Sequence, residues 1–305
     1  MVVRDEPQCL RQLYVDWTER MAANPEMSLP EMRALFDEWH QATGEPTDVT
    51  YADGELGGVP GIWCFPAGAD AAKVVLYTHG GGFAVGTAAS HRKIAGHLAK
   101  AMNTQAFVLD YRRSPEHPFP AQLEDATSAY KALLADGYAA ANIATAGDSA
   151  GGNLAITTVL QLRQDGIEPP GAVIAFSPWL DMEHNGATLD SNAGTDALVQ
   201  KALLQGMSGM FLGEGGDDNR VNPLANPLHA DLSGFPRVYV NAGTHETLQD
   251  NAERFAENAK AAGVDCTLNV VDAQQHVFPF MAGRARLADD ELNRIGQWYQ
   301  QGVRA

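Results

Sequence analysis

The sequence predicts a doubly wound α/β fold with a mostly parallel sheet, and two features of the 305-residue chain predict it. First, short apolar runs alternate with helical patterns from about residue 73 to the end. Near-continuous apolar runs are typical of parallel strands that helices bury on both faces. Second, an alternating, Gly-rich stretch over residues 49–65 precedes them and indicates a hairpin. The length suits one large domain of this type, or two modest ones.

The expected elements follow in chain order. Apolar residues at helical spacing predict helices within residues 6–42, with a break at Pro25 and Pro30. The predicted strands are 73–78, 106–110, 142–146, 172–177, 237–241 and 265–271. The predicted helices lie near 90–101, 121–135, 151–163, 197–211, 250–262 and 284–300. Right-handed crossovers between such strands place helices on both faces of the sheet.

Residues 183–230 interrupt this alternation. They are rich in Gly, Asn and Asp, carry one apolar helix and contain no strand candidate. A long insertion between strands of a compact domain is usually functional. We expect residues 183–230 and the helical residues 1–45 to form a cap over the site. Residues 46–182 and 231–305 would then form the α/β core.

The charge, the cysteines and the apolar runs argue against several kinds of partner and site. The net charge of −17 disfavours binding to nucleic acid or to an anionic membrane surface. Cys9, Cys64 and Cys266 are odd in number and far apart, which argues against a disulfide framework and against a zinc site. No run approaches the roughly 20 apolar residues of a membrane span, and residues 1–6 lack the apolar segment of a secretory signal. We therefore expect a soluble, cytoplasmic protein.

A candidate nucleophile lies directly between a predicted strand and an apolar helix, in Gly147-Asp148-Ser149-Ala150-Gly151. Small residues around a serine let the chain turn sharply from strand to helix and lift the hydroxyl to the end of the sheet. The same five residues could instead form a Gly-rich turn in which the serine caps the helix. The strand and helix on either side favour the nucleophile.

A second glycine motif follows the strand at 73–78 and reads His79-Gly80-Gly81-Gly82-Phe83. Acyl transfer creates a tetrahedral oxyanion, and consecutive glycines let backbone N–H groups approach it without obstruction. A glycine hinge or a phosphate-binding loop is the alternative, but no Gly-Lys-Ser/Thr follows to complete the latter. We expect His79 to orient the loop rather than to carry a proton.

Together with a third segment, these motifs resemble the bacterial esterases related to hormone-sensitive lipase. The third segment is Tyr111-Arg112-Arg113-Ser114-Pro115-Glu116-His117-Pro118-Phe119-Pro120. The resemblance extends from about residue 70 to 285, and the helical N-terminus and residues 183–230 look similar to monoterpene ε-lactone hydrolases. It implies the α/β-hydrolase fold, no cofactor, and oxyanion donors at Gly81, Gly82 and Ala150. A homodimer is common in such esterases.

The resemblance also directs the choice of base and acid. His276 follows the last predicted strand, and His276-Val277-Phe278 stands where relatives usually have His-Gly-Phe. His245 is the rival base. Relatives usually carry Asp-Pro-Leu after the penultimate strand, and Glu246-Thr247-Leu248 aligns there, so Glu246 is the expected acid. Asp250, which looks like a helix N-cap, and Asp272 are the alternatives.

These residues imply hydrolysis of small, compact esters or lactones through an acyl-enzyme on Ser149. The residues expected to contact the substrate are Phe83, Trp179, Met207, Met210, Phe211 and Val277. Apolar cap residues such as Trp17, Phe36 and Trp39 would suit the same substrate, although packing within the cap accounts for most of them. An amidase or deacetylase would use the same three residues. A non-catalytic receptor on this fold is a further alternative, and intact Ser149 and His276 count against it.

Overall fold

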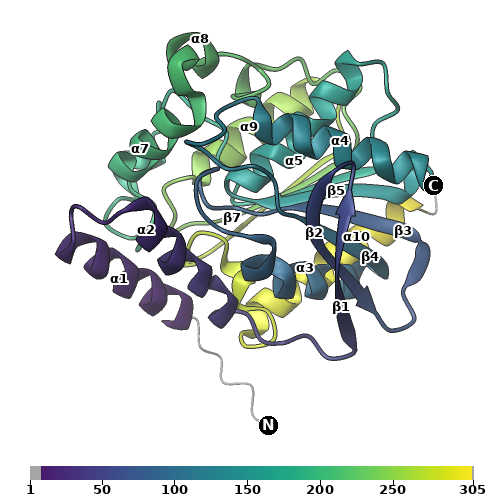
Figure 1. Cartoon of the computed structure of the whole chain (residues 1–305), viewed down its shortest axis with the longest axis horizontal. Helices are drawn as coiled ribbons and strands as arrows, with labels where there is room; N and C mark the ends of the chain where they lie inside the picture. Colours follow the sequence, from purple (N-terminus) through teal and green to yellow (C-terminus); the bar gives the residue numbers. More distant parts are fainter. Residues whose placement is uncertain (1–7, 304–305) are drawn as a thin grey trace.

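Within the residues that it describes, 8–303, the computed structural model contains one eight-stranded sheet in the order β1-β2-β4-β3-β5-β6-β7-β8 (Figure 1). The strands are β1 (Val49–Leu56), β2 (Val59–Pro66), β3 (Asp70–Thr78), β4 (Thr104–Leu109), β5 (Ile143–Asp148), β6 (Ala172–Phe176), β7 (Val238–Gly243) and β8 (Cys266–Val271). β2 runs antiparallel to β1 and β4, and every other pair is parallel. The predicted hairpin and the mostly parallel sheet are confirmed.

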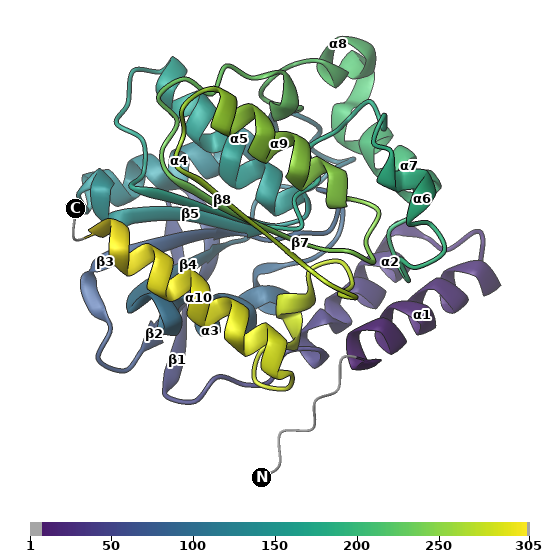
Figure 2. The same cartoon turned by 180° about the vertical axis from the view of Figure 1, so that it is seen from behind.

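Helices cover both faces of this sheet, as the apolar strands require. α3 (Ala88–Met102) and α10 (Arg286–Val303) pack together on one face. α4 (Ala121–Ala135), α5 (Ala150–Gln164) and α9 (Gln249–Ala261) cover the other (Figures 1 and 2). Every residue of β5, β6 and β7 is buried, because these central strands have helices above and below.

The order of the strands creates a crevice at one point of the sheet. β4 lies on one side of β3 and β5 lies on the other, so the connections that leave β3 and β5 run to opposite faces. In open α/β sheets, ligands bind at the carboxyl ends of the strands where the strand order reverses in this way. The loop that begins at His79 follows β3, and Ser149 follows β5. Both glycine motifs therefore meet at the same edge of the sheet.

The N-terminal helices lie beside the helices of residues 183–230. α1 (Gln8–Ala23) and α2 (Leu29–Phe36) are close to α7 (Lys201–Leu212) in both views (Figures 1 and 2). The Thr18 hydroxyl of α1 donates to the carbonyl oxygen of Ala197 at 2.8 Å. Two short helices, α6 (Thr188–Ser191) and α8 (Gly216–Arg220), complete this layer. Residues 1–7, which include most of the segment considered for a secretory signal, lie outside the described residues.

Two local expectations need correction. Pro30 does not break a helix but lies in the first turn of α2, where a missing N–H is tolerated, and the chain instead turns at Asn24–Pro25. The apolar helix expected at 197–211 begins only at Lys201. The Asp196 carboxylate accepts the N–H groups of Leu198 and Val199, which holds these residues in a non-helical turn.

A cluster of aromatic rings joins α1 to the rest of the molecule. Trp17 is fully buried, and its ring centroid lies 5.1 Å from that of Phe36, 5.3 Å from that of Trp39 and 5.7 Å from that of Tyr14. The rings are tilted or perpendicular to each other, an arrangement that favours aromatic pairs beyond the apolar area that they bury.

We expect Trp17→Ala to lower the free energy of unfolding by about 3–5 kcal/mol, the usual cost of emptying a buried aromatic site. Leu287→Ala removes a side chain that is 37% exposed, and it should change stability by less than about 0.5 kcal/mol. Denaturant unfolding of both variants measures the difference. Equal stabilities would show that the ring cluster contributes little.

Candidate active site

Ser149 occupies a strained turn between β5 and α5. Its backbone angles are φ 53° and ψ −118°, a combination that non-glycine residues adopt only where the surrounding structure imposes it. Its N–H donates to Phe176 O at 2.9 Å, and its carbonyl oxygen accepts the Trp179 N–H at 3.0 Å. A Cβ at Gly151 would overlap the Thr78 carbonyl oxygen, and one at Gly147 would overlap the Gly151 carbonyl. The glycines of the motif are therefore required by close backbone contacts.

The loop after β3 turns beside this serine. Gly81 has φ 108° and Gly82 has φ 59°, which only glycine adopts readily. The N–H groups of Ala84 and Val85 donate to Gly81 O at 3.0 and 2.9 Å and close the turn. Ala150 begins α5, so its N–H is among the first-turn donors that have no acceptor within the helix. The backbone donors of the loop after β3 and of the start of α5 thus lie near one another.

His276 and Glu246 form a buried pair. His276 Nδ1 lies 2.7 Å from Glu246 Oε2, and the other carboxylate oxygen accepts the Gly243 N–H at 2.9 Å. The Tyr14 hydroxyl of α1 donates to the His276 carbonyl oxygen at 3.0 Å. Burial lowers the pKa of His276, but the hydrogen bond and charge of Glu246 oppose it, and the net shift is above the ordinary value of 6.5.

The two alternative acids bond to other groups, and the rival base, His245, directly precedes Glu246 in the chain. Asp250 accepts from the Asn251 side chain at 2.9 Å, and Asp272 is exposed and accepts from the Thr244 hydroxyl at 3.1 Å. The Asp250 N-cap expectation is wrong: Leu248 precedes α9, and Asp250 lies in its first turn. There a carboxylate is favourable to the helix dipole without capping it. The His245 backbone N–H donates to Gln274 O at 3.0 Å.

Ser149 and His276 line one narrow cavity of about 30 Å³. Gly81 and Gly82 line it as well, and its other walls are Phe36, Trp39, Trp179, Leu198, Val199, Leu203, Leu204 and Met207. Of the residues expected to contact a substrate, this set includes Trp179 and Met207. Phe83 and Phe211 instead stack on each other with centroids 3.8 Å apart, and the Val277 N–H donates to the Ser177 hydroxyl at 2.9 Å.

The chain is similar to known proteins over most of its length. The model of the alpha/beta hydrolase fold family matches residues 75–280. The chain belongs to this family. An acetyl-hydrolase of Streptomyces hygroscopicus is 36% identical over 274 residues, which cover 84% of this chain and 90% of the relative. The similarity is therefore not confined to the two glycine motifs.

Comparison with solved structures assigns this hydrolase to a narrower group within the family. The crystal structure of an esterase from the bacterial hormone-sensitive lipase family is 36% identical, with a TM-score of 0.92 over 99% of this chain and 100% of that one. A structure of EstE5 soaked with p-nitrophenyl butyrate is 30% identical, with a TM-score of 0.91 over 98% and 99%. The resemblance to esterases related to hormone-sensitive lipase is confirmed. The finer resemblance to monoterpene ε-lactone hydrolases stays a prediction.

In this hydrolase, a buried carboxylate next to the serine holds the glycine loop. Asp148 Oδ1 accepts from the Tyr77 hydroxyl at 2.8 Å and from the Gly80 N–H at 3.2 Å, and Oδ2 lies 3.4 Å from His91 Nε2. Burial raises the pKa of Asp148, but His91 and Tyr77 outweigh it and the net shift is downward. His91 is itself fully buried. Nothing in the sequence connects it to Asp148, because only the fold brings the two together.

His79 orients the same loop, as its neighbours indicate. Its Nδ1 lies 2.8 Å from Gly80 O, its ring stacks on Tyr111 at 4.1 Å, and the Tyr111 hydroxyl donates to His79 O at 2.6 Å. Burial, together with the nearby His91, lowers the pKa of His79 to about 4. A neutral imidazole at this place fits an orienting role better than proton transfer. Glu116, in the third family segment, does not bond to this loop's histidine but forms an ion pair with Arg33 at the surface.

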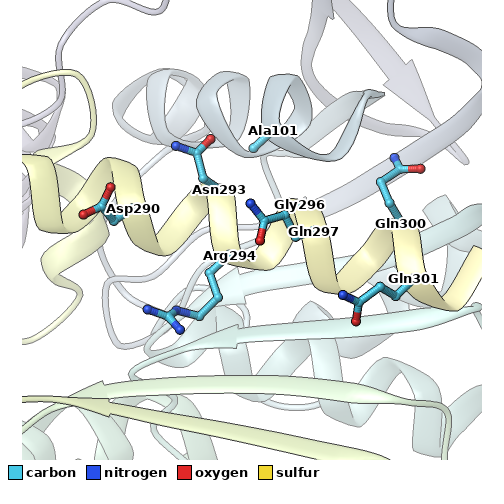
Figure 3. Close-up of a pocket in the computed structure, with 8 residues that line it drawn as sticks. All are labelled: Ala101, Asp290, Asn293, Arg294, Gly296, Gln297, Gln300 and Gln301. Atoms are coloured by element: carbon cyan, nitrogen blue, oxygen red, sulfur yellow. The ribbon is translucent and has the colours of Figure 1, made fainter.

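One other hollow among the described residues lacks the side chains of a serine hydrolase site. A larger hollow of about 840 Å³ runs along α10 and is lined mainly by the amide side chains that project from that helix in Figure 3. Its lining contains no serine, cysteine or histidine. Between residues 8 and 303, no group of three or more His, Cys, Asp or Glu side chains is placed to bind a metal ion. Nor is any helix in that range both long and apolar enough to span a bilayer.

We expect Gly82→Ala to destabilise the protein more than Gly68→Ala. Both glycines have positive φ, which costs an alanine about 1–2 kcal/mol. A Cβ at Gly68 has open space, whereas one at Gly82 would overlap the Met207 sulfur. Thermal unfolding of both variants tests this. If Gly68→Ala were the less stable, the close contact between the loop and α7 would be wrong.

Proposed function

We propose that this protein hydrolyses neutral carboxylic esters or lactones with compact, apolar acyl groups, through an acyl-enzyme on Ser149. The observation that carries the proposal is a single cavity that joins the strained serine, the glycine loop and the Glu246-bound His276. The relatives described above are named an acetyl-hydrolase and an esterase, and these names support ester cleavage by this chain as well. Lactone cleavage is the finer part of the proposal.

The same side chains act in both half-reactions, with His276 first as base and then as acid in each. His276 accepts the proton of the Ser149 hydroxyl as the oxygen attacks the ester carbonyl, and returns it to the departing alcohol. A water molecule then attacks the acyl-enzyme with His276 again as base, which releases the acid and restores the serine. Glu246 fixes the imidazole tautomer and stabilises the imidazolium, which agrees with the raised pKa of His276.

Backbone N–H groups stabilise the charge that develops on the carbonyl oxygen. We assign this role to Gly81, Gly82 and Ala150, because they flank Ser149 at the open edge of the sheet. Preorganised donors of this kind typically contribute about 100- to 1,000-fold each to turnover. The Asp148 carboxylate supports them through its bond with the Gly80 N–H.

The walls of the cavity define the substrate class. Apart from His276, no lining residue has a titratable side chain, so an ionised acyl group would lose its hydration without gaining a partner. The cavity of about 30 Å³ is far smaller than the roughly 300–1,000 Å³ of most ligand sites. Side chains of α2 and α7 must therefore move apart when a substrate enters. In this sense α1, α2 and residues 183–230 act as a cap.

We expect a fluorophosphonate to label Ser149 alone. The Ser149→Ala variant should not hydrolyse p-nitrophenyl butyrate, although it should be as stable to unfolding as wild type. Mass spectrometry of the labelled peptide and steady-state rates measure these outcomes. Rates on a matched ester, lactone and anilide then separate an esterase from a lactonase and from an amidase. Labelling of another serine would contradict the assignment, and faster cleavage of the anilide would favour an amidase.

We expect Glu246→Gln to lower kcat by about 10⁴-fold, because the amide neither carries the charge nor enforces the tautomer of His276. Glu246→Asp should retain part of the activity, since its carboxylate ends one methylene short. Asp272→Asn is the matched control on the neighbouring loop and should stay within about tenfold of wild type. If Glu246→Gln stayed active while Asp272→Asn lost its activity, Asp272 rather than Glu246 would be the acid.

A further inference from the structure

One short segment of the cap is hydrogen-bonded to the loops of both the acid and the base. We call residues 192–199 the strap. The Asn192 side chain donates to Glu246 O at 2.9 Å and to Thr244 O at 3.2 Å. The Gln275 side chain, next to His276, accepts the Ala197 N–H at 2.9 Å and donates to Thr195 O at 2.9 Å. The strap therefore touches the residue on one side of the base and the backbone of the acid.

Asp196 is the charged centre of the strap. Its carboxylate is only 5% exposed. Oδ2 accepts from the Thr247 N–H at 2.8 Å and from the Thr247 hydroxyl at 3.2 Å. Oδ1 accepts from the N–H groups of Leu198 and Val199 at 2.9 and 2.8 Å. Burial of a charge is costly unless donors replace water, and this carboxylate has donors on both oxygens.

Through these bonds, the Asp196 side chain connects two parts of the site, the cavity wall and the acid loop. Leu198 and Val199 form part of the wall of the cavity that contains Ser149. Thr247 directly follows Glu246, the partner of His276. A carboxylate that binds both segments fixes the distance between the wall and the acid. A role in packing alone would not require a buried charge at this place.

The titratable groups that face His276 come from four segments. Glu246 contacts it directly, Asp196 approaches from the strap, and Asp148 lies at the end of β5. Tyr14 of α1 binds its carbonyl oxygen and stays neutral, because burial raises the pKa of this phenol well above 10.0. Burial lowers the pKa of His276, while Glu246 first, and then Asp196 and Asp148, raise it. Burial also raises the pKa of Asp196, against the influence of His276 and the N–H donors.

We propose that Asp196 is a positioning residue for the hydrolysis, because it ties the cavity wall to the acid loop and adds a second negative charge near His276. This inference rests on the proposed function. The carboxylate makes no contact with a substrate. It acts through Glu246 and His276, by holding the acid loop in place and by favouring the imidazolium that forms when Ser149 attacks.

The test is the pH profile of kcat/KM for p-nitrophenyl butyrate in wild type and in Asp196→Asn. His276 must be neutral to act as a base, so activity falls as the pH drops through its pKa. In wild type this acidic limb should lie above 6.5. Asp196→Asn should move the limb down by about 1 pH unit, at the lower end of the effect of a neighbouring charge. Its kcat should also fall by about 10- to 100-fold, as expected for a displaced catalytic group.

Three variants separate charge from packing. Asp250→Asn removes another buried carboxylate, one that does not act on His276, and should leave the limb in place. Thr247→Val removes the hydroxyl that binds Asp196 but keeps the charge, so its limb should match wild type. Asp196→Glu should likewise keep the limb near the wild-type position. If Asp196→Asn cannot be purified, Asp196→Ser replaces it as an uncharged acceptor for the strap N–H groups.

The outcomes are distinct. An acidic limb that is the same in Asp196→Asn and Asp250→Asn overturns the proposal, as does a failure of both uncharged variants to fold, which would make the role purely structural. Neither result affects the proposed function while wild type hydrolyses the ester and Ser149→Ala does not. An inactive wild type, or an active Ser149→Ala, would instead reject the proposed function itself.

Discussion

The backbone of Ser149 is the constraint on which the rest of the site depends. A non-glycine residue at φ 53° and ψ −118° is unfavourable by itself, so it persists only because the residues around it leave no other path. β5 is fixed between β3 and β6, and α5 begins at the next residue. Gly147 and Gly151 let the strand, the helix and the Thr78 carbonyl meet without side chains between them. The turn that exposes the hydroxyl also points the start of α5 toward the same place.

Buried carboxylates hold the other parts of the site against this turn. Asp148 joins the nucleophile turn to the glycine loop through the Gly80 N–H, and Asp196 joins the acid loop to the cap. Each is nearly inaccessible to solvent and is surrounded by N–H and O–H donors. In a medium of low polarity, satisfied bonds of this kind are strong and directional, whereas an unsatisfied group is costly. The two carboxylates therefore favour one arrangement of the loops over others that apolar packing alone would allow.

Features that depend on residues close together in the sequence could be predicted from it. The apolar runs placed all six parallel-sheet strands within a few residues, and the glycine motifs located the two loops at the edge of the sheet. The proposed acid, Glu246, followed from the family resemblance, because Glu246-Thr247-Leu248 aligns where relatives usually carry Asp-Pro-Leu. The sequence could not reveal the partners of buried polar groups. Asp196 and Thr247 are 51 residues apart, and Tyr77 and Asp148 are 71 apart, so only the folded chain brings them together. Part of the cavity wall was equally hidden, because Leu198 and Val199 occupy a turn where an apolar helix was expected.

The hydrogen bonds of the strap also determine which part of the cavity can widen. The backbone N–H groups of Leu198 and Val199 are bonded through Asp196 to the acid loop, so moving this stretch of backbone would break buried hydrogen bonds next to Glu246. Leu203, Leu204 and Met207 project from α7 instead, and Phe36 comes from the end of α2. Apolar side chains held by packing alone change rotamer at far lower cost than a buried carboxylate loses its donors. We therefore expect a substrate to displace the side chains of α7 and α2, and the backbone of the strap to stay in place and keep the acid and the base aligned.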